Sequence, residues 1–402
     1  MKILLVHNRY RSASPSGENQ VVEREGAALK TAGHTVEQFE ANSDDIAGWS
    51  LVERLLVPGR VVWSEKARRS LSRVLSSVRP DVAHIHNTFP LLSPSILYSC
   101  RTARIPVVAT VHNYREICPA GTLFREGRAC HDCVGRLPLP SVLHGCYRGS
   151  PIATLPKAVR VAVHSQTWRN LVSAHVFLSA AQRDQFKILG LPPQRVFVKA
   201  NLVPQPETVA PAPQHRVAYV GRLNMAKGLP VLMAAWDEHV GSNPNSPLRL
   251  AIAGNGSLLA EMKSWAVLSR GVDVLGPLEP PAARRLIASS RAIVVPSAWE
   301  EPFGLVALEA MALGVPPIVS DRGALPEIVA HGRVGVVFRA GDVKGLAGLL
   351  RDVDVYPDRY RHLGTLARAE YAHTFDPARN LEQLLAIYSF AVANPIFANG
   401  SD

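Results

Sequence analysis

Two acidic and two basic side chains in the second half of the chain have types and spacing suited to a charged ligand. Glu301 precedes an expected helix and Glu309 lies inside it, with seven residues between them. A carboxylate in such an apolar stretch is costly to bury unless another group bonds to it. Arg222 and Lys227 lie five positions apart in a loop after an expected strand. Arginine can bind two phosphate oxygens at once and lysine supplies a point charge, so the two cations favour a phosphorylated ligand.

The stretch 293–313, IVVPSAWEEPFGLVALEAMAL, predicts a buried strand, a short polar loop and a helix that starts after Pro302. The first amides of a helix lack an acceptor within the helix, and the helix dipole is positive there. We therefore expect the amides of Phe303, Gly304 and Leu305 to bind a diphosphate. A buried strand followed by a core helix would explain the apolar positions, but not two acids and a glycine in this register.

The spacing E-P-F-G-L-x-x-x-E, followed by EAMALGVPPIVSD and GALPEIV, resembles the nucleotide-sugar site of retaining glycosyltransferases of family four. The segment GRLNMAKG resembles that family's G-R-x(4)-K-G segment. The resemblance implies an α/β protein of the GT-B fold: two Rossmann-like parallel-sheet domains facing a central cleft, with a C-terminal helix crossing back to the first domain. It also implies transfer of a sugar from a nucleotide-diphosphate donor of the UDP or GDP type to a glycan, lipid-linked or other hydroxyl acceptor. The anomeric configuration would be retained.

The resemblance assigns roles to matching residues. Arg222, Lys227 and the helix start would stabilise the departing diphosphate without a metal ion, so catalysis would need no cofactor. Glu301 would hold the sugar hydroxyls, His112 would reach the sugar from the other side, and Glu309 would fix the ribose.

Three glycines complete the expected substrate contacts. Gly254, in the segment GNGS, permits a ligand to approach the backbone closely. Gly276, in VLGPL, resembles the segment that meets the nucleobase through backbone groups. Gly17 lies in the first loop, where the family often has two adjacent glycines near the acceptor and this chain has Ser16–Gly17.

A length of 402 residues favours two domains. We expect a first, acceptor-side domain over residues 1–203 and a second, nucleotide-sugar-binding domain over residues 204–377. The Pro- and Ala-rich stretch 201–215 is the expected linker. The apolar spacing after residue 376 predicts a final helix, about 378–402, that packs back on the first domain. In the first domain two expected strands end in His-Asn, at His86 and His112, where the strand ends of an α/β sheet line a ligand site.

Four cysteines lie in a loop-rich insert, 118–146, with the spacing C-x11-C-x2-C-x12-C. Disulfides are uncommon in cytosolic proteins. A set of four thiolates with one C-x2-C pair could instead hold a structural zinc ion. Buried free thiols are the alternative. The four candidate ligands are Cys118, Cys130, Cys133 and Cys146.

The chain carries a formal charge of +11. A basic surface can attract nucleic acid, anionic lipid or a phosphorylated substrate. The sequence has no nucleic-acid-binding signature, so we expect no nucleic-acid partner and rank an anionic membrane or a lipid-phosphate acceptor higher. A solvated charged face is the simpler explanation. The N-terminal run MKILLVHNRY is too short an apolar stretch for a signal peptide, which favours the cytoplasm, with peripheral contact at the inner membrane face as an option.

Two other functions suit the same residues. A nucleotide-sugar epimerase would need a titratable base at the sugar ring. A protein that binds a nucleotide-sugar without turnover would not need its charged site residues for catalysis.

Overall fold

The computed structural model describes residues 1–12, 17–206 and 214–397. The chain divides into two compact units. The first unit comprises Met1–Arg125, Cys130–Leu202 and Ala378–Asp402, and the second comprises Glu126–Ala129 and Val203–Pro377. We call them the first and second domains. Part of the expected linker, residues 207–213, lies outside the described residues, as do Ser16 and the last five residues of the expected C-terminal helix.

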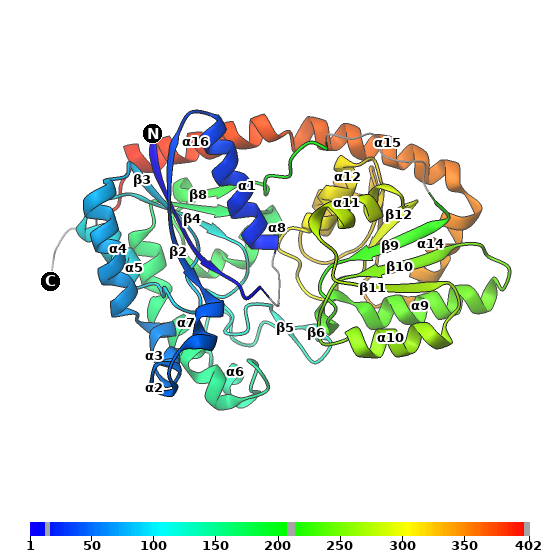
Figure 1. The fold of residues 1–402 in the computed structure, drawn as a ribbon, viewed down its shortest axis with the longest axis horizontal. Coiled ribbons are helices and arrows are strands. Elements are labelled where there is room, and N and C mark those ends of the chain that lie inside the picture. Colours follow the sequence, from blue (N-terminus) through cyan, green and yellow to red (C-terminus); the bar gives the residue numbers. More distant parts are fainter. Residues whose placement is uncertain (13–16, 207–213, 398–402) are drawn as a thin grey trace. The chain divides into compact units, whose positions relative to one another are not determined.

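The first domain contains a six-stranded parallel sheet in the order β2-β1-β3-β4-β7-β8 (Figure 1). Its strands are β1 (Lys2–Arg9), β2 (Thr35–Asn42), β3 (Val82–Asn87), β4 (Val107–Val111), β7 (Ala174–Phe177) and β8 (Val196–Val198). Every residue of β3 and β7 is buried, as expected for a parallel sheet covered on both faces.

Helices connect these strands. They are α1 (Gly17–Thr31), α2 (Leu51–Leu55), α3 (Val57–Val62), α4 (Glu65–Val78), α5 (Ile96–Thr102), α6 (Leu139–Leu143), α7 (Pro151–Leu171) and α8 (Ala180–Gln185). The insert between β4 and α6 holds two-residue strands, β5 (Phe124–Arg125) and β6 (Arg128–Ala129). The Ser64 hydroxyl accepts a hydrogen bond from the Ala67 amide and starts α4 as a separate helix after α3.

The second domain contains another six-stranded parallel sheet, in the order β11-β10-β9-β12-β13-β14. Its strands are β9 (Arg216–Val220), β10 (Arg249–Ala253), β11 (Val272–Gly276), β12 (Ala292–Val295), β13 (Pro317–Ser320) and β14 (Val336–Phe338). The connecting helices are α9 (Leu229–Ser242), α10 (Leu259–Leu268), α11 (Pro280–Ala288), α12 (Leu305–Ala312), α13 (Leu325–Ile328), α14 (Val343–Val355) and α15 (Pro357–Thr374).

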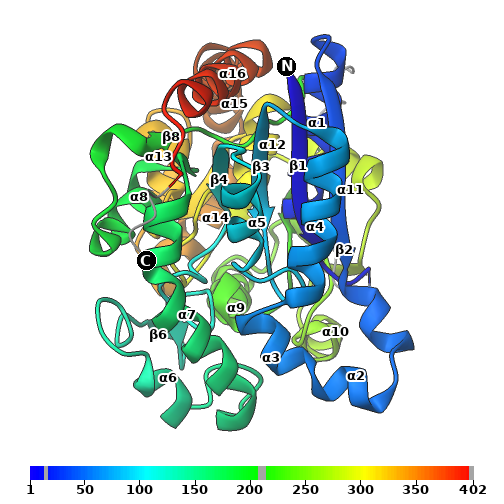
Figure 2. The same ribbon diagram turned by 90° about the vertical axis from the view of Figure 1, so that its left-hand side faces the viewer.

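The last helix, α16 (Pro377–Ala393), completes the core of the first domain (Figures 1 and 2). Its Leu384, Ile387 and Tyr388 side chains are buried with Ile3 and Leu5 of β1. The Tyr388 hydroxyl also lies 2.7 Å from Nδ1 of His84. Two Rossmann-like domains and a C-terminal helix that returns to the first domain are thus confirmed.

Candidate functional site

An ion pair between Lys227 and Glu301 is the centre of the candidate site in the second domain. Nζ of Lys227 lies 2.6 Å from Oε2 of Glu301. The same carboxylate oxygen accepts hydrogen bonds of 2.9 Å each from the Ser297 hydroxyl and the Trp299 indole. Glu301 is 7% exposed, so three donors satisfy a carboxylate that would otherwise be costly to bury.

Backbone contacts between two loops hold this pair in place. One loop follows β9 and the other follows β12, which are neighbours in the sheet. The Ala226 carbonyl accepts hydrogen bonds from the amides of Ala298 and Trp299 at 2.9 and 3.2 Å. Gly228 has a φ of +72°, and a Cβ on it would lie 1.8 Å from the Pro296 carbonyl oxygen. Only glycine fits at this position, because any side chain would push the loops apart.

Arg222 adds a second positive charge next to this pair. Burial alone would raise the pKa of Glu301, but the charge of Lys227 and the three hydrogen bonds lower it. Burial lowers the pKa of Lys227, Glu301 opposes this, and the charge of Arg222 lowers it further. Arg222 is exposed and, within the described residues, no carboxylate pairs with it. Two cations therefore share one carboxylate, which leaves a positive surface for an anion.

The start of α12 follows directly on Glu301. Gly304 adopts a left-handed φ of +92° as the residue before the helix, and a Cβ on it would lie 2.7 Å from Cδ2 of Leu325. Phe303 and Gly304 are buried, while Leu305 and Glu309 are half-buried. The first amides of α12 have no acceptor within the helix. The structure thus places this helix start beside the Lys227–Glu301 pair.

The three predicted substrate-binding glycines differ in their surroundings. A Cβ on Gly254 would lie 1.8 Å from the Gly221 carbonyl oxygen, so Gly254 allows two loops of the domain to pack closely. Gly276 is buried, ends β11 with a φ of +71°, and has nothing within 4 Å of the position that a Cβ would take. Gly17 is the exposed first residue of α1 in the first domain. Their contacts with a substrate stay predictions.

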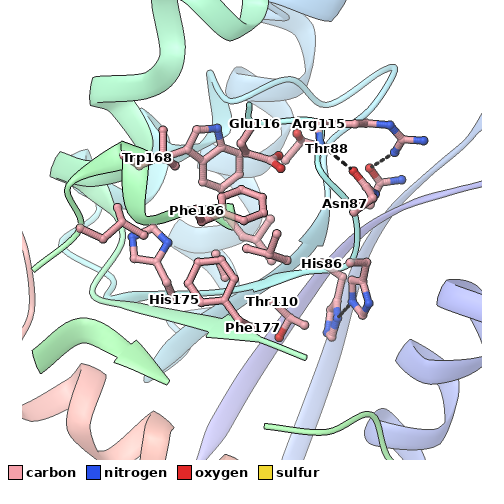
Figure 3. A pocket seen from close by; sticks show the side chains of 17 residues that line it. His86, Asn87, Thr88, Thr110, Arg115, Glu116, Trp168, His175, Phe177 and Phe186 are labelled. Atoms are coloured by element: carbon pink, nitrogen blue, oxygen red, sulfur yellow. Dashed lines mark hydrogen bonds between the residues drawn. The ribbon is translucent and has the colours of Figure 1, made fainter. Parts of the chain in front are cut away.

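A pocket in the first domain lies at the ends of β3 and β4 (Figure 3). His86 and His112 line it, together with Arg115, Glu116 and an apolar wall that includes Trp168 and Phe186. Nδ1 of His86 lies 3.0 Å from Nε2 of His112. Burial lowers the pKa of His112 to about 3, so this imidazole is neutral at physiological pH.

Beneath these histidines lies a buried ion pair that no sequence motif predicted. Oε1 of Glu25, on α1, lies 2.7 Å from Nζ of Lys199, and both side chains are 3% exposed. The other carboxylate oxygen of Glu25 lies 3.6 Å from Nε2 of His86. In the sequence, Glu25 can be recognised as a buried acid because it lies among the apolar positions of α1, where Val21, Val22 and Leu29 are also buried.

Glu25, His84 and His86 place one possible ligand atom each within 4.8 Å of one another. Both nitrogens of His84 are already bonded, to the hydroxyls of Tyr388 and Thr110 at 2.7 Å each. Lys199 already neutralises Glu25. Because these groups already have partners in the protein, the cluster is a hydrogen-bonded network of the core.

The four cysteines of the insert are half-buried free thiols. Burial, together with neighbouring Cys118 and Cys133, raises the pKa of Cys146 to about 11, so the thiols lie near one another. Within the described insert, however, no three of their sulfur atoms lie within 4.8 Å of each other. The donor types suit zinc, but the sulfurs would have to draw together to reach Zn–S distances of about 2.3 Å. A structural zinc ion stays a prediction.

The chain matches two known protein families, one in each half. Residues 16–201 match the family described as "Glycosyl transferase 4-like domain", and residues 214–353 match "Glycosyl transferases group 1". Each half of the chain thus matches a family of glycosyltransferase domains. The site built around Lys227 and Glu301 therefore lies in the group 1 glycosyltransferase domain.

Curated relatives match part of this chain. A D-inositol 3-phosphate glycosyltransferase of Rhodococcus erythropolis is 33% identical over 193 residues, which cover 46% of this chain and 43% of the relative. A glycogen synthase of Mycobacterium tuberculosis is 36% identical over 162 residues, 39% of this chain and 38% of the relative. The matches thus span less than half of these relatives' length.

Solved structures resemble the chain over nearly its whole length. A sucrose-phosphate synthase from Thermosynechococcus elongatus has a TM-score of 0.70 at 18% identity and covers 98% of this chain and 99% of its own. Anabaena Alr3699/HepE in complex with UDP has a TM-score of 0.67 at 18% identity and covers 97% of this chain and 100% of its own. With the two parallel sheets, this likeness shows that the chain has the GT-B fold.

Proposed function

We propose that this protein transfers a sugar from a nucleotide-diphosphate donor to a hydroxyl acceptor with retention of the anomeric configuration. The observation that carries the proposal is the Lys227–Glu301 pair, with Arg222 beside it and the start of α12 after it. Charge on the departing diphosphate must be stabilised for the sugar to leave. Two cations and a helix start supply this stabilisation from one domain.

Each residue has a role in this mechanism. Arg222 and Lys227 bind diphosphate oxygens, helped by the amides of Phe303, Gly304 and Leu305. Glu301 orients Lys227 and accepts hydrogen bonds from sugar hydroxyls through its less engaged oxygen. Glu309 binds the ribose. His112 contacts the transferred sugar, and its bond to His86 holds the ring in one orientation.

The state of Glu301 supports retention without a covalent intermediate. A carboxylate oxygen with three donors and a lowered pKa is a weak nucleophile and a weak base. The acceptor hydroxyl then attacks on the face from which the diphosphate departs. It forms the new C–O bond as the sugar–phosphate bond breaks, and its proton passes to a leaving-phosphate oxygen.

A UDP-sugar is the preferred donor in this proposal. The support is that related folds were solved with UDP and with UDP-glucose. The acceptor is a glycan or a lipid-linked hydroxyl compound, and the protein acts in the cytoplasm.

A nucleotide screen tests the proposal. The thermal midpoint should rise with UDP more than with GDP or ADP, and the Lys227→Met variant should lose this shift. Incubation with the UDP-sugar alone should release sugar slowly by hydrolysis. Epimerised donor would instead establish the isomerase, and binding without any turnover in the presence of acceptor extracts would establish a binding protein.

A further inference from the structure

Cations and aromatic rings alternate along one edge of the first domain. The Cζ atom of Arg115 lies 5.3 Å from the Tyr10 ring centroid and 4.8 Å from that of Phe89. Nζ of Lys157 lies 4.8 Å from the Phe89 centroid and 3.7 Å from that of Tyr147. Arg148 continues the series at 5.3 Å from Tyr147. The cation–ring ladder consists of Tyr10, Arg115, Phe89, Lys157, Tyr147 and Arg148.

The ladder lies where an α/β sheet binds ligands. Tyr10 directly follows β1, Phe89 follows β3 and Arg115 follows β4, which are consecutive neighbours in the sheet. Ligands of open α/β sheets lie beyond the carboxyl ends of the strands. Arg115 also lines the pocket that contains His112 (Figure 3).

Lys157 lacks a counter-ion in this setting. It is 5% exposed, and among the residues that the structure describes it forms no hydrogen bond and no ion pair. Glu116, which follows Arg115 in the chain, is paired with Arg160 at 3.2 Å. Arg115 bonds to neutral oxygens of Tyr10 and Asn87. Cation–ring contacts of about 2 kcal/mol do not offset the burial of an ammonium group.

We propose that the ladder binds a phosphate group, with Lys157 and Arg115 as its direct contacts. An oxyanion next to Lys157 would supply the missing counter-charge, and Arg115 could bind a second oxygen of the same group. The identification of this phosphate as part of the sugar acceptor rests on the proposed function. Phosphate binding itself does not.

The state of Lys157 without ligand agrees with this site. Burial, together with the charges of Arg115 and Arg160, lowers the pKa of Lys157 to about 6. Replacing Lys157 by methionine, which has a similar length and no charge, should therefore raise the thermal midpoint of the free protein while removing a ligand contact.

The test uses the Lys227→Met background, in which the donor site is disabled, and inorganic pyrophosphate as the probe. Calorimetry should show binding that weakens about tenfold or more on Lys157→Met and stays unchanged on Lys30→Met, an exposed control on α1. Equal affinity for both variants, or no binding in the background protein, overturns the proposal. The rise of the parent protein's thermal midpoint with UDP tests the proposed function independently of this site.

Two further probes distinguish the sources of the phosphate. Farnesyl diphosphate in detergent binding more tightly than pyrophosphate, with the same dependence on Lys157, assigns the site to a lipid-linked acceptor. Equal binding of the two assigns it to a soluble phosphorylated acceptor.

The helices α2, α6 and α7 expose large apolar side chains. Their exposed side chains include Leu51 and Leu55 at 77% and 79%, Leu139 and Leu143 at 62% and 81%, and Ile152 and Leu155 at 85% and 51%. Both α3 and α6 pack against α7, and Figure 2 shows these helices at one end of the first domain. We call this surface the docking face. Exposed apolar side chains that gather at one end of a domain are typical of an interaction site.

The docking face is also basic. Its helices and the turn before α7 carry four arginines that are not buried, against one acid, Glu53. These arginines are Arg54, Arg60, Arg148 and Arg169. Leucine side chains together with basic residues match an anionic bilayer, which offers an apolar interior beneath a negative surface. A polyanionic glycan would pair with the basic residues but would not cover the exposed leucine side chains.

We infer that the docking face binds the surface of an anionic membrane. Vesicles that contain about 30% phosphatidylglycerol should sediment with the protein, whereas pure phosphatidylcholine vesicles should not. The triple variant Leu55→Gln, Leu143→Gln, Ile152→Gln should lose this binding. The control Val267→Gln, Leu268→Gln changes side chains that are 85% and 89% exposed on α10 of the second domain and should retain it.

Equal loss in the control, or no vesicle binding by the parent protein, overturns this inference. Self-association that the triple variant abolishes, measured by ultracentrifugation without lipid, would assign the docking face to a second copy of the chain instead.

Discussion

Lys227 and Glu301 are 74 positions apart in the chain, yet their side chains meet at 2.6 Å. The contact exists because β9 and β12 are neighbours and because the loops after them share backbone hydrogen bonds. This contact joins the basic segment that contains Lys227 and the acidic segment that contains Glu301 into one charged surface.

Replacing Lys227 by methionine should reduce sugar transfer by about two orders of magnitude or more, because a cation that stabilises the leaving diphosphate is lost. Steady-state rates with a UDP-sugar measure this. The Lys263→Met variant, with an exposed lysine removed from α10, should retain the parent rate. Unchanged transfer in Lys227→Met would remove this residue from the catalytic site.

Replacing Glu301 by glutamine should lower the free energy of unfolding by about 3 kcal/mol, since it leaves Lys227 largely buried without its counter-charge. UDP should bind more tightly, because Lys227 is then free for the diphosphate, while sugar transfer should fall. The double variant with Lys227→Met should recover much of the stability in urea unfolding. If the double variant instead lost as much stability as the two single variants together, Lys227 and Glu301 would not be coupled.

Gly228→Ala should disrupt donor binding without touching any charged side chain. The new Cβ would collide with the Pro296 carbonyl and separate the loops that carry Lys227 and Glu301. Gly241→Ala is the matched control, because Gly241 lies in α9 with nothing near its Cβ position and should gain about 0.5–1 kcal/mol from higher helix propensity. A UDP titration that is normal in Gly228→Ala would contradict this role of the loop contact.

His175 should make the fold sensitive to acid. It is 3% exposed, and burial lowers its pKa to about 3, below its ordinary value of 6.5. Between these values the unfolded chain binds more protons than the folded chain, so stability falls as pH decreases through 6.5. From pH 7 to pH 5 this one group accounts for about 2 kcal/mol. His175→Phe should therefore show a smaller loss of unfolding free energy over this interval, and an unchanged slope would exclude His175 as the cause.

The local parts of the site could be predicted from the sequence. The strand–loop–helix pattern around residues 293–313 places Glu301 before a helix start, because apolar runs, Pro302 and Gly304 define these elements locally. The position of the last helix followed from its apolar spacing and from the resemblance to a family.

Long-range pairings could not be predicted in this way. Glu25 and Lys199 are 174 positions apart, and neither has a neighbouring sequence pattern that marks it as half of an ion pair. The cation–ring ladder likewise draws residues from four separate segments, since it depends on which strands are neighbours.

The placement of α16 has a consequence for the order of folding during synthesis. The first domain contains the N-terminus, but its core includes Leu384, Tyr388 and Ala391. Nearly all of the second domain lies between these segments, so a ribosome makes it before the first domain has all of its parts. The domain that is begun first is thus the one completed last, and a nascent chain stalled before residue 380 would carry an open, apolar sheet face available to chaperones.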